Sequence, residues 1–398
     1  MGLPVVYHAP QPTPVDLEVI GLIDQLRDAM RHRVAEPRRW ARSLRRMALA
    51  RAVQGSNSIE GYNASLDDVA AAVDGEPVLD ANAETQAALT GYRDAMTYVL
   101  QIAQDGAPID EGLLKALHFM MIKHDISKGP GRWRPGEIYV RREETNEIVY
   151  TGPDADDLPN LIASMLEELE RSTEPVLVRA AMAHLNLAMI HPYRDGNGRM
   201  ARCLQTLVLA RERIVAPVFS SIEEYLGRNT QDYYDVLAEV GRGAWHPEND
   251  ARPWVEFCLT AHYRQARTHL RRIEEIEELW RRCAELASSH KLPERTIGGL
   301  IEAAYGFRLR NAVYRTVVES TAGEPISELT ASRDLKALTD ARLLRAVGEK
   351  RGRYYLPTDE LVELRQKIRA ARPPRNEYDP FEVVRSGRQL SLIEEFGP

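Results

Sequence analysis

Hydrophobic residues recur at the spacing of amphipathic helices along most of the chain. Between residues 16 and 33, Leu17, Ile20, Ile23 and Leu26 fall on one face of such a helix. Similar runs predict helices over residues 82–104, 110–123, 159–171, 176–190 and 254–288, with a basic helix after Pro37 through residue 52. The pattern therefore predicts a mainly α protein.

One stretch departs from this helical pattern. The segment Gly129-Pro130-Gly131 stops the helix before it, and hydrophobic and polar residues then alternate over 137–141. A polar turn at 143–146 leads into residues 147–150, so the stretch is predicted to form a β-hairpin.

The pattern changes again after His290–Pro293, where we expect a domain boundary. Short helices, a basic turn at 348–353 and the strand-like residues 354–356 follow, and this order resembles a winged helix. Residues 332–339 would be its recognition helix and Lys350–Arg353 its wing tip. Such a module reads DNA through helix and wing, here with Arg333 and Lys336, or serves as a protein-interaction or dimer module, and both alternatives stay open.

The expected organisation has four parts. An N-terminal helical region covers residues 1–80, a core and connector helix 81–288, the winged-helix domain 289–360 and a tail 361–398, irregular from Arg372. The net charge of −7 gives no overall attraction to nucleic acid. Three cysteines without a Cys-x-x-Cys pair predict neither a zinc site nor a disulfide framework, and no apolar run is long enough for a membrane span. We expect a cytoplasmic protein with reduced cysteines.

The most informative stretch is residues 191–202, His-Pro-Tyr-Arg-Asp-Gly-Asn-Gly-Arg-Met-Ala-Arg. It lies between two helical runs, so it predicts a helix end, a short loop and a new helix start. Glycines at 196 and 198 permit positive φ, and the unpaired first-turn N–H groups of a helix attract anions. This geometry predicts an anion cradle.

Charged side chains in the same stretch strengthen that interpretation. Arg199 and Arg202 lie on one face of the first helical turn, where cations oppose the helix dipole unless an anion is bound. Asp195 beside an anion is unfavourable unless a cation such as Mg²⁺ bridges the two. His191 is a suitable base near neutral pH. Together they indicate phosphoryl or nucleotidyl chemistry.

The stretch also resembles the active-site motif of Fic-domain proteins, His-Pro-Phe-x-Asp/Glu-Gly-Asn-Gly-Arg-x-x-Arg. The resemblance covers roughly residues 15–285 and departs at Tyr193, which stands where the family has Phe. We expect Tyr193 to fill the same apolar slot if its hydroxyl finds a partner. The implied fold is a Fic-type helical core in which the hairpin is a flap.

The resemblance implies roles for the motif residues in transferring AMP from ATP to a hydroxyl of a target protein. His191 would accept the hydroxyl proton and Asp195 would hold Mg²⁺. The nucleotide would be bound along the loop and the first turn of the next helix, by Gly196, Asn197, Gly198, Arg199, Met200, Ala201 and Arg202.

A second segment, Ser56-Asn57-Ser58-Ile59-Glu60-Gly61, reads in isolation as a helix end capped by Gly61. It also resembles the inhibitory motif of one Fic class, Ser/Thr-x-x-x-Glu-Gly/Asn. The resemblance implies that Glu60, with Ser56, pairs with Arg202 and blocks the γ-phosphate position. Breaking a buried charge pair costs on the order of 3–5 kcal/mol, enough to hold an enzyme mostly inactive.

Three further positions follow from the family pattern. Tyr234 and Leu237 match a Tyr-Tyr-x-x-Leu pattern that lines the adenine pocket, although Gly241 replaces an asparagine that can contact the base. Ile138 would lie close to the nucleotide. The 137–150 hairpin would hold the target's hydroxyl-bearing segment by strand addition. We expect His184, by contrast, to be a packed or hydrogen-bonded histidine.

The leading hypothesis is therefore a protein adenylyltransferase with ATP and Mg²⁺ as substrate and cofactor, autoinhibited by Glu60. Two alternatives remain: a DNA-binding regulator whose Fic core senses nucleotide, and a Fic enzyme that transfers UMP or a phosphoryl group. A glycine at position 198 lets the cradle approach an α-phosphate closely and favours nucleotidyl transfer. Homo-oligomer formation is left open and no membrane partner is expected.

Overall fold

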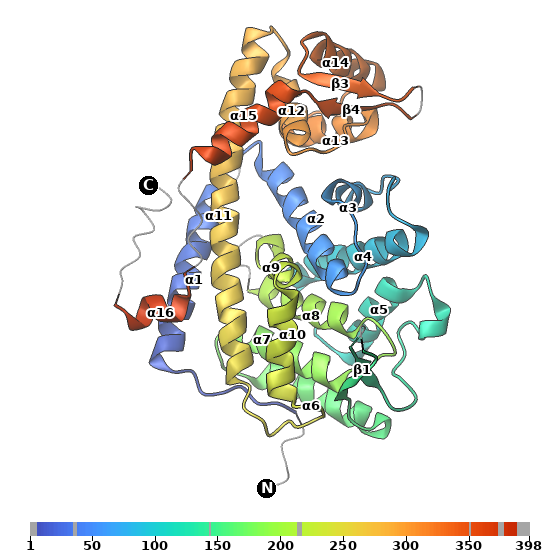
Figure 1. The fold of residues 1–398 in the computed structure, drawn as a ribbon, viewed down its shortest axis with the longest axis vertical. Coiled ribbons are helices and arrows are strands. Elements are labelled where there is room, and N and C mark those ends of the chain that lie inside the picture. Colours follow the sequence, from blue (N-terminus) through green and yellow to red (C-terminus); the bar gives the residue numbers. More distant parts are fainter. Residues whose placement is uncertain are drawn as a thin grey trace.

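The computed structural model describes residues 6–34, 38–142, 145–212, 217–349, 352–372 and 378–387. Over these ranges the protein is mainly α-helical, as predicted (Figure 1). Its strands form two antiparallel hairpins, β1 (Tyr139–Arg141) with β2 (Ile148–Thr151) and β3 (Leu344–Val347) with β4 (Tyr354–Pro357). The first is the hairpin expected at 137–150; residues 143 and 144 of its turn lie outside the described part.

The two helices on either side of the loop 191–196 pack closely on each other. α7 (Val176–Ile190) is buried almost all round, and α8 (Asn197–Arg211) follows it after the six-residue loop 191–196. A helix that is apolar on every face must be covered by others. The covering helices are α4 (Ala83–Asp105), α5 (Glu111–Ile122), α6 (Leu158–Arg171) and the long α11 (Arg252–Ser289). α10 (Thr230–Gly241) contacts α7 through the Tyr233 hydroxyl and His184.

A long helix, α11 (Arg252–Ser289), runs the length of the molecule (Figure 1). Trp254 at its start is fully buried and donates a 2.7 Å hydrogen bond to the carbonyl oxygen of Ala181 in α7. α1 (Pro14–Arg33) packs along α11, and Thr13 caps α1 with a capping box. α11 therefore connects the N-terminal helix α1 to α7 and α8.

The second helix, α2 (Ala41–Ile59), packs closely on the short α9 (Glu223–Arg228). Gly55 and Gly227 permit this approach, because a Cβ on Gly227 would lie 2.6 Å from the Cα of Gly55. α2 continues past residue 52, where the basic helix was expected to end, to Ile59, in agreement with the interpretation of 56–61 as a helix end, and Gly61 follows with a φ of +80°. α3 (Leu66–Val73) then begins at its cap Ser65.

Beyond α11 the chain forms three helices and the second hairpin, in the order expected for residues 296–357. The helices are α12 (Ile297–Ala304), α13 (Asn311–Ala322) and α14 (Glu328–Asp340). We call residues 294–357 the C-terminal unit; its identity as a winged helix stays a prediction. Lys350 and Arg351 of the expected wing tip lie outside the described residues.

The last part of the chain differs from expectation. α15 (Asp359–Ala370) runs across the boundary expected at residue 360 and packs on α11 and α12. The irregular tail expected from Arg372 is wrong over Pro380–Arg385, which form α16. Asp379 caps this helix, and Phe381 and Val383 are buried where α16 packs on α1. Tertiary packing makes six residues helical that would be marginal alone.

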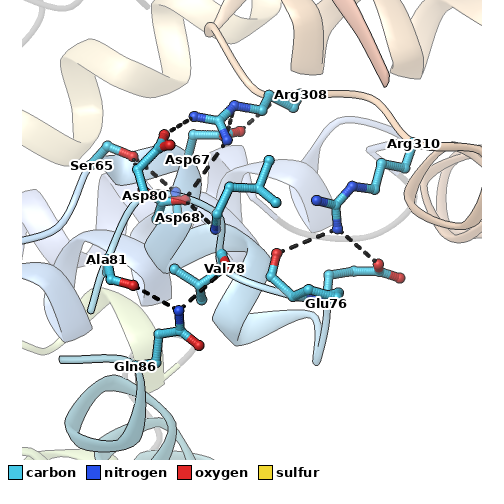
Figure 2. A network of polar contacts seen from close by, with 12 residues as sticks. Ser65, Asp67, Asp68, Glu76, Val78, Asp80, Ala81, Gln86, Arg308 and Arg310 are labelled. Carbon is cyan, nitrogen blue, oxygen red and sulfur yellow. Dashed lines mark hydrogen bonds and ion pairs between the residues drawn. The ribbon is translucent and has the colours of Figure 1, made fainter. Parts of the chain in front are cut away.

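Charged contacts join the C-terminal unit to α3 and the residues after it (Figure 2). The Nε of Arg308 lies 2.9 Å from Asp67, its backbone N–H donates to the same carboxylate at 2.7 Å, and its Nη2 pairs with Asp80. Arg310 lies 3.5 Å from a carboxylate oxygen of Glu76. The unit is therefore held against the α2–α3 region by ion pairs.

The structure also carries no membrane-crossing candidate among its described residues: none of those helices combines sufficient length with sufficient apolar character.

Candidate active site

His191 stands at the junction of α7 and the central loop. Its backbone is left-handed, with a φ of 51°, which ends α7 and turns the chain. The ring nitrogen Nδ1 lies 3.0 Å from the carbonyl oxygen of Ala188, to which it can only donate. This tautomer leaves Nε2 unprotonated, as a general base requires. Burial lowers the pKa of His191 below its ordinary value, so the ring is neutral near pH 7.

Arg134, just before the first hairpin, fixes this junction from outside the motif. It is buried, its Nε donates to the carbonyl oxygen of His191 at 2.9 Å and its backbone N–H donates to Pro192 at 2.8 Å. Its remaining guanidinium nitrogens donate to the carbonyl oxygens of Gly136 and Pro153. One arginine therefore ties both ends of the hairpin segment to the loop 191–196.

The loop is closed by the side chain of Asn197. Its Oδ1 accepts a 2.9 Å hydrogen bond from the backbone N–H of Tyr193, and its Nδ2 donates to the carbonyl oxygen of the same residue. The side chain expected to bind phosphate is thus engaged in holding the loop, and the backbone N–H of Asn197 is what remains for an anion. Gly196 precedes it with a φ of +77°.

Tyr193 fills the apolar slot, as expected. It is fully buried, and its ring stacks on His118 with the centroids 3.7 Å apart. The hydroxyl, however, has no hydrogen-bond partner among the described residues, so the expected condition for the Phe-to-Tyr departure is not met. His118 accepts from the N–H of Gly131 at 2.9 Å and lies 3.0 Å from the carbonyl oxygen of Asp195, which braces the loop from α5.

Arg199 is the most unusual side chain of the site. Its exposed fraction is 0%, yet none of its three guanidinium nitrogens has a hydrogen-bond partner within the described part of the chain. Its nearest charged neighbour is Asp195 at 3.7 Å, and its guanidinium lies 5.1 Å from the ring centroid of Tyr62. Buried arginines without partners are costly, so this arrangement fits a ligand with negative charge.

Arg202, one helical turn on, is occupied by the segment at the end of α2. Its Nη2 donates to Oε1 of Glu60 at 2.6 Å, and its Nε donates to the hydroxyl of Ser56 at 2.7 Å. Glu60 also lies directly over Gly198, because a Cβ there would be 2.5 Å from Oε1 of Glu60. The structure therefore brings together Glu60, Ser56 and Arg202, as the sequence predicted.

Asp195, the expected metal ligand, pairs with a lysine that the sequence analysis did not select. Nζ of Lys128 lies 2.7 Å from its Oδ2, and its Oδ1 accepts from the N–H of Gly196 at 2.6 Å. Burial raises the pKa of Asp195, but the contact with Lys128 and the charge of Arg199 bring it below its ordinary value. The carboxylate is ionised at neutral pH, which suits a cation.

The metal expectation can be compared with the donors present. The described residues contain no group of three or more His, Cys, Asp or Glu side chains that could hold a metal ion. Mg²⁺ is commonly bound by one or two carboxylates together with substrate phosphates and water. A single carboxylate, Asp195, at the start of the cradle fits that mode, with a nucleotide supplying the other oxygens.

The remaining predicted nucleotide contacts lie at different depths. The side chains of Met200 and Ala201 are fully buried in α8, and the N–H of Met200 donates to the carbonyl oxygen of Gly196, so their contacts with a nucleotide stay predictions. Tyr234 is 45% exposed, and its hydroxyl donates to the carbonyl oxygen of Ile59 at 3.1 Å. Leu237, one turn on, is partly buried against the core.

Ile138, expected near the nucleotide, lies at the base of the first hairpin. Its carbonyl oxygen accepts from the N–H of Gly152 at 3.1 Å, and a Cβ on Gly152 would meet the Ile138 side chain at 2.6 Å. The same Cβ would be 3.7 Å from the carbonyl oxygen of Ile190, the residue before His191. Ile138 therefore packs on Gly152, which lies near the end of α7, and the contact of Ile138 with a nucleotide stays a prediction.

His184 has the role that the sequence favoured. It is fully buried, its Nδ1 lies 2.6 Å from Oε1 of Gln205 and its Nε2 lies 3.0 Å from the hydroxyl of Tyr233. Burial lowers its pKa to about 3, so it is neutral in the folded protein. All three cysteines are free and buried, also as expected.

Four residues of the site escaped the sequence analysis: Tyr62, His118, Lys128 and Arg134. Each contacts the loop from a segment more than 50 residues away along the chain, so the spacing of residues in the sequence did not indicate these contacts. The available signal was local: Lys128 and Arg134 flank the Gly-Pro-Gly break, where loop residues often carry function.

A helical core with a hairpin beside a His-Pro-Tyr-x-Asp-Gly-Asn-Gly-Arg loop defines a class of protein. Residues 108–209 match the model of the Fic/DOC family. The matched residues include α5, the hairpin, α7 and most of α8. This central part of the chain therefore matches the Fic/DOC family.

Known proteins similar to this chain agree with that assignment. It is 26% identical over 259 residues to the protein adenylyltransferase Fic of Nematostella vectensis, an alignment that covers 62% of this chain and 55% of that protein. It is 28% identical over 134 residues to the protein adenylyltransferase fic-1 of Caenorhabditis elegans, covering 33% and 26% respectively. The chain thus spans about half or less of the length of these relatives.

Solved structures show the same fold. A Fic family protein from Desulfovibrio desulfuricans G20 superimposes with a TM-score of 0.55 at 24% identity, covering 89% of this chain and 99% of that one. Fic-1 from C. elegans (residues 134–508) does so with a TM-score of 0.51 at 20% identity, covering 64% and 72%. The likeness extends to the helical architecture as a whole.

Proposed function

We propose that this protein is an adenylyltransferase that transfers AMP from ATP to a hydroxyl group of a target protein, and that Glu60 inhibits it. Arg199 carries the proposal: a fully buried arginine without a hydrogen-bond partner among the described residues, beside the cradle at the start of α8, fits a nucleotide phosphate. The names of the similar adenylyltransferases support the same reaction.

In the proposed reaction, the target hydroxyl oxygen attacks the α-phosphorus of ATP while Nε2 of His191 accepts its proton. A phosphodiester bond forms to the target, the bond between the α- and β-phosphates breaks, and pyrophosphate leaves. The backbone N–H groups at Asn197 and Gly198 would neutralise charge at the α-phosphate, with Arg199 and Arg202 on the outer phosphates. Mg²⁺, held by Asp195, would neutralise charge on the departing phosphates.

Inhibition follows from competition for one guanidinium group. The two hydrogens of Nη2 of Arg202 are donated to Glu60 at 2.6 Å and to the carbonyl oxygen of Ser56 at 2.9 Å, so this nitrogen has none left for a phosphate. The exposed fraction of the Glu60 side chain is 24%, so its ion pair with Arg202 is largely shielded from water. Tyr62, which lies over Arg199, extends the same segment across the second arginine.

The target would bind along the first hairpin. β1 and β2 form a two-stranded sheet that is bridged at its end from Thr151 to Ala244, and its residues Tyr139 and Ile148 are exposed, which suits addition of an extended segment. DNA binding by residues 332–353 and self-association stay predictions. On α14 the exposed Lys336 pairs with Asp340 at 2.6 Å, so its charge is partly balanced.

The test is the intact mass of the purified chain after incubation with ATP and Mg²⁺. We expect a gain of one or more AMP units, increased on the order of 10-fold or more in Glu60→Gly and absent in the double variant Glu60→Gly/His191→Ala. AMP addition in the double variant would reject the role of His191. Equal rates for wild type and Glu60→Gly would reject the inhibition. No mass gain in either, with ATP binding intact, would reject adenylyl transfer.

A further inference from the structure

A cluster of arginines lies between α2, α9, α11 and α15, built from residues that the catalytic loop does not use. We call it the Arg51 cluster. Its charged members are five arginines and two glutamates: Arg51, Arg228, Arg272, Arg365, Arg372, Glu224 and Glu275. Side chains of six of these seven have exposed fractions of 7–19%; the exception, Arg228, is 49% exposed and marks an opening to solvent.

Both glutamates of the cluster are already saturated with donors. Glu224 accepts hydrogen bonds from two guanidinium nitrogens of Arg272, of which one lies at 2.6 Å. It also pairs with Arg228 at 2.6 Å and accepts from the side-chain amide of Gln265 at 3.2 Å. Glu275 receives Arg365 at 2.6 Å and Arg372 at 3.3 Å. No carboxylate of the cluster remains for a further cation.

Arg51 is the arginine of the cluster that has no close carboxylate partner. Its closest approach to a carboxylate is 3.9 Å, to Glu224, and its Nε is buried with no hydrogen-bond partner among the described residues. Burial, and next the charge of Arg272, lower the pKa of Arg51 to about 10. A guanidinium group whose pKa falls is one that its surroundings do not neutralise.

Two more donors of the cluster lack partners in the described structure. The hydroxyl of Tyr305 is buried and unpartnered, with the guanidinium of Arg365 4.0 Å from its ring centroid. The Nη2 of Arg372 is buried and unpartnered as well. Native proteins rarely leave buried donors unsatisfied, and three in one cationic cluster require an acceptor.

We propose that the Arg51 cluster binds a small phosphate oxyanion, with Arg51 and the Tyr305 hydroxyl as donors to it. Phosphate fits because its oxygens match the planar fork of a guanidinium group, and because the cluster has a formal excess of three positive charges. The ligand is free phosphate, pyrophosphate or the phosphate end of a nucleotide, which share this chemistry. The site stands whether or not the chain transfers AMP.

Calorimetric titration of the full-length protein tests the site with three probes: inorganic phosphate, pyrophosphate and ADP. Arg199→Gln removes a donor of the catalytic cradle and serves to separate the two sites. We expect Arg199→Gln to retain binding of at least one probe, and Arg51→Gln to weaken that binding by about tenfold or more. The probe that retains binding identifies the source of the phosphate.

Two further variants serve as controls for this test. Arg42→Gln makes the same charge change at an exposed position of α2 and should leave the affinity unchanged. Tyr305→Phe removes only the unpartnered hydroxyl, so it should fold, and it should weaken binding severalfold even if Arg51→Gln does not fold. Binding lost in Arg199→Gln but kept in Arg51→Gln and Tyr305→Phe would overturn the proposal, as would the absence of binding for every probe.

Discussion

Gly55 of α2 and Gly227 of α9 meet backbone to backbone. A Cβ on Gly55 would lie 2.4 Å from the carbonyl oxygen of Glu223, and a Cβ on Gly227 would lie 2.6 Å from the Cα of Gly55. No flexible side chain can yield at this contact, so the two helices can touch only while both residues are glycine. The contact fixes α2 one residue before Ser56, the first residue that holds Arg202.

Gly227→Ala should therefore separate α2 from α9. We expect a loss of about 1–3 kcal/mol in the free energy of unfolding, as for other overpacked sites, measured by denaturant titration. Gly21→Ala is the matched control, since a Cβ there meets nothing within 4 Å; it should be neutral or stabilising by up to about 1 kcal/mol. Equal effects of the two changes would contradict the close contact.

Ser56→Ala should release Arg202 in part. The change leaves Nε of Arg202 without its 2.7 Å acceptor while the Glu60 contact remains, so we expect ATP affinity to rise severalfold, less than in Glu60→Gly. Binding titration with ATP measures this. Ser58→Ala is the control because its hydroxyl donates to Gly55 and does not touch Arg202; it should leave the affinity unchanged. A larger effect at position 58 would contradict the assignment.

Tyr193→Phe should cost no stability. The Tyr193 hydroxyl is buried without a partner in the described structure, so its removal should be neutral or stabilise by about 1 kcal/mol in thermal unfolding. Tyr150→Phe makes the same chemical change where the hydroxyl donates a buried 2.7 Å hydrogen bond to Met189, and it should destabilise by about 1 kcal/mol. Destabilisation by Tyr193→Phe would reveal an acceptor for its hydroxyl.

Stability should fall in mild acid because buried histidines resist protonation. Burial lowers the pKa of His118 to about 4 and those of His184 and His269 to about 3. The unfolded chain takes up protons on these rings near pH 6.5, whereas the folded chain does so only near the lowered values. Stability is therefore full above about pH 6.5 and is lost as the pH falls, at up to about 1.4 kcal/mol per unit for each ring. Unfolding titrations at pH 7 and pH 5 with equal midpoints would contradict this.

Arg308→Ala should weaken the contact between the C-terminal unit and α3. Arg308 has an exposed fraction of 21% and forms ion pairs with both Asp67 and Asp80, so its replacement should lower the free energy of unfolding by about 1–3 kcal/mol. Lys336→Ala breaks an exposed pair with Asp340 and should cost about 0.5 kcal/mol or less. Hydrogen exchange in α3 measures the local effect; protection unchanged in Arg308→Ala would show that the ion pairs do not hold the unit.

The sequence predicted most of the fold because its helices are long and strongly periodic, as in α1, α7 and α11. It predicted the loop at 191–202 because twelve consecutive positions combine glycines, charges and a histidine in one pattern. Lys128 on Asp195 and Tyr62 on Arg199 could not be predicted, since these contacts depend on how distant segments pack. α16 was missed although Asp379-Pro380 is a helix-start signal, because its stability comes from α1.

Under the proposed inhibition, the group that competes with the nucleotide for Arg202 is part of the chain itself. A free inhibitor leaves its enzyme on dilution, but a carboxylate tethered one residue beyond the end of α2 keeps the same effective concentration at Arg202 at any protein concentration. The proposed inhibition therefore predicts that dilution does not activate a single chain. It also predicts a nucleotide threshold, set by the nucleotide concentration and by how firmly α2 is held, to which the packing at Gly55 and Gly227 contributes.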